Sequence, residues 1–267
     1  MIQGKISVLM GIYNCADTLE EAVQSILNQT YPNWQMIMCD DCSTDDTYAV
    51  AERIAKQWPD KFILIRNEKN RKLQYTLNHC LRYADGEYIA RMDGDDTCST
   101  NRFEKEIAIL NSHPEYALVS CQMSLFDKDG EFRVIHYSPE PAKESLLRTS
   151  QFCHAGCMMR TSVMKELGGY SEDANCERVE DYDLWVRLYA AGYRGYNIQE
   201  VLYQMRDDRN AVKRRSLRSR LNEAELKIRI VKTFSFSKKY YFYACVPVVK
   251  ALIPTTVYLY AHKNKGR

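Results

Sequence analysis

The stretch Tyr88-Ile89-Ala90-Arg91-Met92-Asp93-Gly94-Asp95-Asp96 joins an apolar run to an acidic cluster. Residues 88–92 predict a buried strand, which starts after the Asp85-Gly86 turn. Ligands of an open α/β sheet bind outside the carboxyl ends of its strands, where this cluster falls. Carboxylates that converge there repel one another, and their oxygens suit Mg²⁺ or Mn²⁺ as the neutralising cation. The stretch therefore predicts a metal site for a diphosphate-bearing substrate, although Asp-Gly-Asp-Asp alone is also compatible with a polar turn.

On the N-terminal side of this stretch, short apolar runs alternate with helical patterns. The sequence Asp17-Thr18-Leu19-Glu20 is typical of a capped helix start. The predicted strands are residues 6–10, 34–39 and 62–65, and the predicted helices begin at Leu19, at Ser43 or Thr44 (ending near Gln57), and at Lys72 (ending near Tyr83). This alternation is typical of βαβ units, so we predict an α/β fold around a mostly parallel sheet.

On the C-terminal side the pattern is less regular. A helix is predicted near residues 102–111, a strand at 117–123, and a hairpin turn at Lys128-Asp129-Gly130. These elements are interpreted as α+β decoration on the sheet. A basic helix at residues 213–233 and an aromatic segment at 240–261 follow.

The charges divide the chain into two unlike parts. The net charge is +2, yet residues 213–267 carry fourteen Lys and Arg side chains against two acids, while residues 1–212 carry 23 against 33. We therefore predict a main domain over 1–212 and a basic, aromatic helical tail over 213–267. A basic tail favours an anionic partner, whereas an acidic body argues against nucleic acid as a partner of the main domain.

The tail is apolar enough to raise the question of a membrane span. Pro247, Lys250 and Pro254 interrupt it, and a span needs about 20 predominantly apolar residues. Its tyrosines and cations favour a helix at an anionic headgroup interface, and packing on the catalytic domain is the alternative. The N-terminal residues lack a signal-peptide pattern, so we expect a cytoplasmic protein at the inner face of the cell membrane.

Several function classes do not fit the sequence. No Gly-x-Gly-x-x-Gly or Gly-x-x-x-x-Gly-Lys-Ser/Thr is present, which argues against dinucleotide oxidoreductases and P-loop NTPases. The ten cysteines are interpreted as mostly small buried hydrophobes, as expected in a reducing compartment. Cys39 and Cys42 have zinc-ligand spacing, but paired aspartates occupy the gap between them.

Beyond these patterns, the chain resembles the family 2 inverting glycosyltransferases of the GT-A fold. The resemblance covers most of residues 5–205 in the family's order, and is strongest to bacterial exopolysaccharide and capsule-biosynthesis members. It rests on SVLMGIYN (7–14), CDDCSTD (39–45), NRKL (70–73), LN (77–78), DGEYIARMDGDD (85–96), His154, Met159-Arg160, LGGY (167–170), EDYDLWVRL (180–188), YNIQE (196–200) and KRRS (213–216). It implies a mostly parallel central sheet with helices on both faces and a C-terminal helical extension.

The resemblance also implies a nucleotide-sugar site. The ring of Tyr13 would offer a flat face to a base. Asp40 would accept a hydrogen bond from a uracil-type N–H, which favours a UDP-sugar, and Arg71 would reach the nucleotide or its diphosphate. The expected binding residues are Ile12, Tyr13, Asn14, Asp40, Asp41, Arg71, Lys72 and Asp93.

The implied chemistry is an in-line displacement with inversion. Asp93 and Asp95 would hold Mn²⁺ or Mg²⁺, which bridges the diphosphate. Asp181 matches the family's catalytic base, and Glu180 would position the acceptor. On the acceptor side, His154 lies near the acceptor or is a satisfied core histidine, and Trp185 either stacks on a sugar or packs in its helix.

Two positions depart from the family. Lys72 stands where Gly is frequent, and it would either contact a phosphate or point outward. Cys42 replaces the Gly that commonly follows the paired aspartates, which leaves the conformation of that loop open.

We therefore predict a metal-dependent glycosyltransferase that transfers a sugar to a growing, lipid-linked or free, exopolysaccharide of the biofilm type. Other polysaccharide-assembly proteins are expected partners. The alternative is a non-catalytic or moonlighting regulatory protein that acts on another protein or surface through its basic tail. A nucleotidyltransferase is disfavoured, because its Gly-rich, Arg-containing N-terminal loop is missing.

Overall fold

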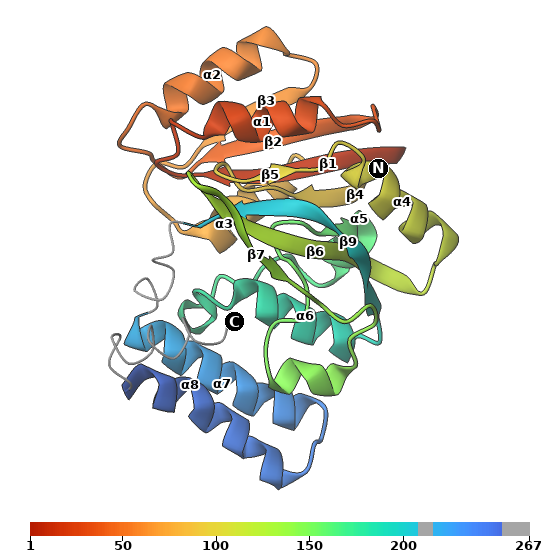
Figure 1. The fold of residues 1–267 in the computed structure, drawn as a ribbon, viewed down its shortest axis with the longest axis vertical. Helices are drawn as coiled ribbons and strands as arrows, with labels where there is room; N and C mark the ends of the chain where they lie inside the picture. Colours follow the sequence, from red (N-terminus) through yellow and green to blue (C-terminus); the bar gives the residue numbers. More distant parts are fainter. Residues whose placement is uncertain (208–215, 253–267) are drawn as a thin grey trace.

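The computed structural model describes residues 1–207 and 216–252 of the chain (Figure 1). Strands and helices alternate through the first half, as predicted. In chain order the elements are β1 (Ile2–Ile12), α1 (Leu19–Leu27), β2 (Trp34–Asp40), α2 (Thr47–Gln57), β3 (Phe62–Arg66), α3 (Leu73–Leu81), β4 (Gly86–Arg91), β5 (Thr97–Cys98), α4 (Arg102–Ser112), β6 (Tyr116–Asp127), β7 (Gly130–Ile135), η1 (Lys143–Leu147), β8 (Met158–Arg160), α5 (Thr161–Glu166), η2 (Ala174–Cys176), α6 (Glu180–Ala190), β9 (Arg194–Arg206), α7 (Leu217–Thr233), η4 (Lys238–Tyr241) and α8 (Phe242–Leu252).

The described strands form one sheet in the order β3-β2-β1-β4-β8-β6-β9-β5, with β7 paired to β6. The strands β3, β2, β1 and β4 are mutually parallel, which confirms the predicted βαβ units. In the register of β1 and β2, Ile12 lies opposite Asp40. The carboxyl ends of these strands therefore meet at one edge of the sheet.

The second half extends this sheet instead of decorating it, which corrects our expectation. Strand β8 pairs antiparallel with both β4 and β6, and β6 runs parallel to β9. Burial of β6 from Tyr116 through Leu125 explains the difference, since such a strand needs neighbours on both sides and cover on both faces. The predicted hairpin turn is confirmed, because Asp127 pairs with Gly130 at the start of β7.

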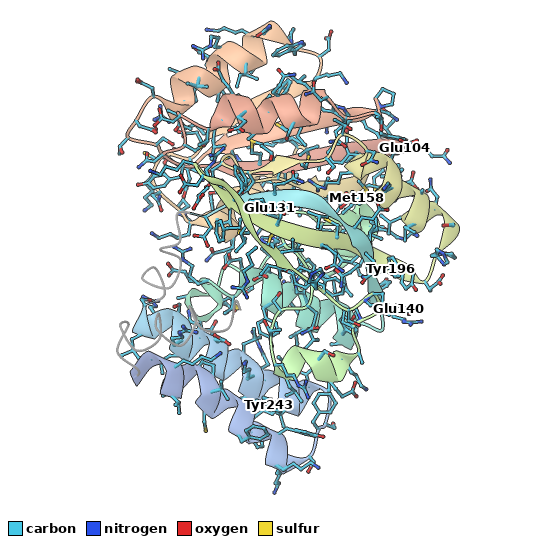
Figure 2. The ribbon with its side chains drawn as sticks, in the orientation of Figure 1. Glu104, Glu131, Glu140, Met158, Tyr196 and Tyr243 are labelled. Carbon is cyan, nitrogen blue, oxygen red and sulfur yellow. The ribbon has the colours of Figure 1, made fainter. Side chains whose placement is uncertain are left out.

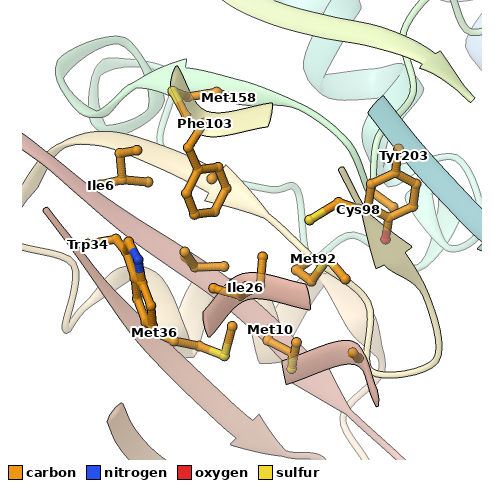
Figure 3. Close-up of a cluster of buried hydrophobic side chains, with 14 of the residues drawn as sticks. Ile6, Met10, Ile26, Trp34, Met36, Met92, Cys98, Phe103, Met158 and Tyr203 are labelled. Atoms are coloured by element: carbon orange, nitrogen blue, oxygen red, sulfur yellow. The ribbon is translucent and has the colours of Figure 1, made fainter. Parts of the chain in front are cut away.

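Helices cover both faces of the sheet, and alternate strand residues supply the two cores. Val8 and Met10 of β1 pack into a cluster with α1, α2 and α4, which Figure 3 shows around Phe103. Leu9, between them, packs into a second cluster with α3, α5, α6 and α7. Burial of each such side chain stabilises the fold by about 2 kcal/mol relative to leaving it exposed. Because side chains alternate between the two faces of a strand, this burial fixes the position of β1 in the sheet, and so fixes which residues lie at its carboxyl end.

One helix start and one helix cap differ from the prediction. Helix α2 begins at Thr47 and not at Ser43 or Thr44. The Ser43 hydroxyl accepts a hydrogen bond from the Asn14 amide (3.1 Å), and the Thr44 amide donates to the Asn14 side chain (2.9 Å). Helix α1 begins at Leu19 as predicted, but the Thr18 hydroxyl donates to the Gly94 carbonyl (3.0 Å) and does not cap the helix. These bonds tie both helices to loops at the binding edge.

The basic and aromatic C-terminal segment forms a pair of helices, α7 and α8, at the end of the molecule away from α2 (Figure 1). Ser216 caps α7 by accepting a hydrogen bond from the Ser219 amide (3.2 Å). Helix α7 packs on α6, η1 and η2, and α8 packs on α7. Residues 213–215 and 253–261 of the predicted helix and aromatic segment lie outside the described residues. No helix within residues 1–207 and 216–252 has the length and apolarity that a bilayer span requires.

Candidate functional site

Three cavities adjoin at the carboxyl edge of β1, β2 and β4, since they share lining residues. A cavity of about 280 Å³ and one of about 380 Å³ share Gly11 and Tyr13. A third, of about 440 Å³, shares Arg178 and Glu180 with the first and Arg206 with the second. We call the cavity of about 280 Å³ the base-side cavity, the one of about 380 Å³ the acidic cavity, and the one of about 440 Å³ the acceptor-side cavity. The three cavities therefore neighbour one another, and the first two lie at the edge that the sequence predicted.

The base-side cavity is lined by Ile12, Tyr13, Asp41 and Lys72, four of the predicted nucleotide-binding residues. The Asp41 carboxylate orders the loop before α3, because it accepts hydrogen bonds from the amides of Arg71 (2.7 Å) and Lys72 (2.9 Å). Tyr13 is 48% exposed and lines the cavity. This cavity has a flat aromatic wall and an acceptor carboxylate.

Two other predicted nucleotide-binding residues, Asp40 and Arg71, do not line the base-side cavity. Asp40 is fully buried, and its carboxylate pairs with the Arg66 guanidinium (2.9 Å) and accepts from the Ser43 amide (3.3 Å). The exposed guanidinium of Arg71 stacks on the ring of Tyr75 at 4.0 Å from its centroid. The structure thus brings Asp41 to the cavity, while Asp40 supports the strand end and Arg71 lies on the adjoining surface.

Both departures from the family pattern fall on left-handed backbone. Lys72 has φ +71° and ψ 167°, a region that is essentially restricted to Gly, and Cys42 has φ +62°. These loops therefore keep a glycine-like path although a larger side chain stands there. Such strain costs about 1–3 kcal/mol at each non-Gly residue.

The acidic cavity contains Asn14, Asp93 and Asp95. The Arg91 guanidinium lies 2.6 Å from the Asp93 carboxylate. Desolvation, with the negative charge of Asp93 as a second cause, raises the pKa of Asp95. These two carboxylates share a cavity and repel each other, as the sequence predicted.

Asp96 has a structural place in the same loop. Its carboxylate accepts hydrogen bonds from the Tyr203 hydroxyl (2.8 Å) and the Arg206 amide (2.7 Å). Burial, followed by the charges of Asp93 and Asp95, raises its pKa to about 8. Asp96 therefore ties the acidic loop to β9 and leaves the other two carboxylates to the cavity.

The acidic cavity offers the carboxylates of Asp93 and Asp95 to a divalent cation. Among residues 1–207 and 216–252, no group of three or more His, Cys, Asp or Glu side chains is placed to hold a metal ion. Mg²⁺ and similar ions usually bind through one or two carboxylates together with substrate phosphates. The Asp93 and Asp95 pair fits a cation of that kind.

The acceptor-side cavity contains Asp181, at the N-terminal end of α6. The Ser150 hydroxyl donates a hydrogen bond to its carboxylate (3.0 Å). Burial raises the pKa of Asp181, and burial together with the charge of Asp181 raises the pKa of Glu180 to about 7. Glu180 Oε2 is buried without a hydrogen-bond partner among the described residues. The pair has the elevated proton affinity that suits a base near neutral pH.

The two predicted acceptor-side residues have different surroundings. His154 lines the same cavity as Asp181, and its Nε2 lies 2.8 Å from the Tyr170 hydroxyl. Burial, with the nearby Arg91 charge as a second cause, holds the pKa of His154 well below its usual value. Trp185 is fully buried against Phe152, with ring centroids 5.5 Å apart. Its ring therefore packs in the core and offers no face to a sugar.

Three arginines of the site were missed by the sequence analysis. Arg206 at the end of β9 lines both the acidic and the acceptor-side cavity, and its Nε donates to the Asp95 carbonyl (3.0 Å). Arg178, with φ +69°, precedes α6, and Arg220 comes from α7. Arg178 lies two residues before Glu180, which is a signal that sequence reading could have used. Arg206 and Arg220 stand outside any motif.

Comparison with known proteins identifies the relatives of this chain. The family model described as "Glycosyl transferase family 2" matches residues 7–168. EpsE of Bacillus subtilis (strain 168), named as a glycosyltransferase, is 41% identical over 263 residues, or 98% of this chain and 94% of that protein. AmsE of Erwinia amylovora, named as an amylovoran biosynthesis glycosyltransferase, is 28% identical over 97% of this chain and 99% of that protein. WfaP of Escherichia coli is 29% identical over 73% of this chain and 74% of that protein. It is named as a UDP-Glc:alpha-D-GlcNAc-diphosphoundecaprenol beta-1,3-glucosyltransferase.

Solved structures share the fold. The mannosyltransferase PcManGT from Pyrobaculum calidifontis, in complex with GDP-Man and Mn²⁺, has a TM-score of 0.64 at 20% identity and covers 97% of this chain and 79% of that one. S. aureus TarS in complex with UDP-GlcNAc has a TM-score of 0.66 at 17% identity, and the match covers 93% of this chain and 71% of that one. The predicted GT-A fold is confirmed. Because the family model matches more than half of the chain and EpsE is similar along nearly all of it, this chain belongs to glycosyl transferase family 2.

Proposed function

We propose that this glycosyltransferase is metal-dependent and inverting, and that it moves a sugar from a UDP-linked donor to a hydroxyl of a growing exopolysaccharide. The observation that carries the proposal is the position of Arg206. It lines the cavity of the Asp93 and Asp95 pair and also the cavity of Asp181. A donor diphosphate and an acceptor hydroxyl in these two cavities would approach each other at that side chain.

The donor half of the proposal rests on the base-side and acidic cavities. Tyr13 lines both, so a nucleotide base on its ring would lead a diphosphate toward Asp93 and Asp95. The carboxylate of Asp41 matches the imide N–H of uracil, and TarS binds UDP-GlcNAc in a similar fold. A bound Mn²⁺ or Mg²⁺ would neutralise charge on the leaving diphosphate. Arg206 adds a second positive charge on the same side.

The acceptor half rests on Asp181. Its carboxylate takes the proton of the acceptor hydroxyl while that oxygen bonds to the anomeric carbon and the bond to the diphosphate oxygen breaks. A single displacement from the opposite face inverts the anomeric configuration. The hydrogen bond from Ser150 holds one carboxylate oxygen and orients the other. The unpartnered oxygen of Glu180 would accept a hydrogen bond from the acceptor and position it.

We infer a phosphate-bearing, lipid-linked acceptor. Arg178, Arg206 and Arg220 line the acceptor-side cavity and would attract a phosphate group, although Arg206 also pairs with Glu21 and Arg220 with Glu223. The relative WfaP is named for a diphosphoundecaprenol-linked acceptor. Such an acceptor places the enzyme at the inner face of the cell membrane, in contact with other polysaccharide-assembly proteins.

The non-catalytic or moonlighting alternative is not favoured. A protein that only binds a partner has no need of Asp181 in a cavity beside the Asp93 and Asp95 pair, and the family model covers that pair. The basic segment also contributes Ser219, Arg220 and Glu223 to the acceptor-side cavity, so part of it belongs to the enzyme's site.

A donor panel tests the proposal. The full chain is incubated with UDP-, GDP- and dTDP-sugars and a lipid-diphosphate-linked glycan, with Mn²⁺, with Mg²⁺ and with a chelator. We expect transfer from a UDP-sugar that stops with the chelator and returns when metal is added. Transfer that persists in the chelator, or retention of the anomeric configuration in the product, would contradict the proposal.

A further inference from the structure

The pair of helices α7 and α8 exposes an apolar surface that the catalytic site does not use. Leu217, Leu221, Ala224 and Ile228 recur at helical spacing on one side of α7. Leu217 is 60% and Leu221 is 50% exposed, which is unusual for large aliphatic side chains aligned on one helix. The remaining face of α7 packs on the body of the enzyme through Leu226 and Ile230.

Helix α8 continues this surface. An apolar groove between the two helices is lined by Ala224 and Ile228 of α7 and by Tyr241, Ala244, Cys245, Val248 and Val249 of α8. Val249 and Phe242 are each 55% exposed beside it. Figure 2 shows side chains along this helix pair, with Tyr243 labelled on α8. The "hairpin face" is defined here as Leu217, Leu221, Ile228, Phe242, Cys245 and Val249.

The exposed charges of residues 216–252 are mostly positive, and Glu225 is the exposed acid among them. The exposed cations of the helix pair are Arg218, Lys232, Lys238, Lys239 and Lys250. The two acids of residues 216–252 have partners: Glu223 pairs with Lys227 (3.2 Å), and Glu225 accepts a hydrogen bond from Asn175 (2.9 Å). An apolar strip with a fringe of Lys and Arg complements an anionic lipid surface, where each nearby cation adds about 1 kcal/mol of attraction.

We propose that the hairpin face docks on an anionic lipid bilayer and thereby presents the acceptor-side cavity at the level of the headgroups. Helix α7 makes the connection, because Ser219, Arg220 and Glu223 line the cavity while Leu217, Leu221 and Ile228 lie on another side of the same helix. A lipid-linked acceptor then reaches Asp181 without leaving the membrane. The reason for this docking rests on the proposed function, but the docking itself does not require transfer to occur.

Vesicle co-sedimentation of the full chain tests the proposal. The vesicles contain phosphatidylcholine alone or mixed with phosphatidylglycerol. We expect binding to the mixed vesicles that weakens with added salt. Leu221→Glu and Ile228→Glu should each lower the partition coefficient about tenfold. Lys238→Ala with Lys239→Ala should lower it on the mixed vesicles only.

The matched control is Ile2→Glu. Ile2 is an aliphatic residue of β1 that is 50% exposed, as Leu221 is, but it lies outside the hairpin face. Vesicle binding should be unchanged in this variant. Circular dichroism and the melting temperature of each variant separate a loss of docking from a loss of fold.

Three outcomes overturn the proposal. The first is wild-type protein that ignores the mixed vesicles at low salt. The second is Leu221→Glu and Ile228→Glu variants that bind vesicles as well as wild type. The third is a wild-type dimer in analytical ultracentrifugation that Leu221→Glu converts to a monomer without changing vesicle binding, which would assign the face to a second copy of the chain.

A parallel assay separates this proposal from the proposed function. Transfer to a soluble glycan acceptor should be the same in wild type and in both hairpin-face variants, because neither residue lines the three cavities of the site. Vesicle binding by a protein that transfers nothing would leave the docking in place and refute the proposed function. Transfer without vesicle binding would leave the proposed function in place and refute the docking.

Discussion

The Nε atom of Arg206 donates a hydrogen bond to the main-chain carbonyl of Asp95 across 3.0 Å. This bond joins the end of β9 to the acidic loop after β4, although the two residues are 111 positions apart. The Arg206 amide also donates to the Asp96 carboxylate (2.7 Å), so one residue holds the loop in two places. The position of the Asp95 carboxylate therefore depends on Arg206 as well as on its own strand.

Replacement of Arg206 should reduce catalysis more than stability. We expect Arg206→Gln to lower kcat about 10- to 100-fold, because it removes a positive charge from beside the leaving diphosphate and loosens the acidic loop. Arg206→Lys should recover part of this loss by restoring the charge without the Nε donor. Steady-state kinetics check both values. Arg133→Gln, an exposed change on β7, is the control and should leave kcat unchanged.

Lys72 should show a trade-off between stability and donor binding. Its backbone lies in a region suited to Gly, so Lys72→Gly should raise the free energy of unfolding by about 1 kcal/mol or more. The side chain lines the base-side cavity, so the same change should raise KM for the donor several-fold. Denaturant titration and donor kinetics measure the two effects. Lys69→Gly, in the same loop, should bring no stabilisation, and equal stabilisation by both changes would refute the strain argument.

The buried ion pair of Arg102 and Glu106 should dominate the stability of α4. Both side chains are fully buried 3.2 Å apart, and Arg102 also donates to the Arg91 carbonyl (2.9 Å) at the end of β4. Glu106→Ala leaves a buried guanidinium without its partner and should cost about 3–5 kcal/mol. The surface pair of Lys105 and Glu200 is the control, since Lys105→Ala should cost less than about 1 kcal/mol. Similar losses in both variants, measured by denaturant unfolding, would contradict this ranking.

The pH dependence of catalysis should follow the Asp181 and Glu180 pair. Burial raises the pKa of both carboxyls, to about 7 for Glu180, so a base drawn from this pair is protonated as pH falls and kcat/KM should fall on the acid side. Ser150→Ala removes a hydrogen bond that favours the ionised Asp181 carboxylate. The acid side of the kcat/KM profile should therefore move to higher pH in this variant. Glu180→Gln removes a neighbouring negative charge and should move it to lower pH. If the acid side of the pH profile moved in the same direction in both variants, the assignment would be contradicted.

The fold and the carboxylates of the site were predictable because local patterns determine them. The continuously buried runs of β1 and β2 and the acidic loop after β4 are visible in the sequence, and they place Asp93 and Asp95 at the carboxyl edge of the sheet. The β6 and β9 half of the sheet was less predictable, because its strands mix parallel and antiparallel pairings and leave the regular alternation of strand and helix, as β8 shows between β4 and β6. Pairing of this kind has no local signature.

The remaining parts of the site depend on contacts between distant elements. Arg206 and Arg220 reach the acceptor-side cavity from the end of β9 and from α7, and neither belongs to a motif. The late start of α2 has the same origin, since Ser43 and Thr44 bond to Asn14 before they can begin a helix. The left-handed backbone at Lys72 and Cys42 was hidden because neither residue is the glycine that usually marks it.

The most direct test of the central claim is transfer by Asp181→Asn compared with donor binding by the same variant. Asparagine keeps the size of the side chain and can still contact Ser150, but it cannot take a proton from the acceptor. We expect kcat to fall at least about 1,000-fold while the UDP-sugar, in the presence of Mn²⁺, binds with wild-type affinity in calorimetry. Transfer within about tenfold of wild type by a folded Asp181→Asn variant would contradict the account.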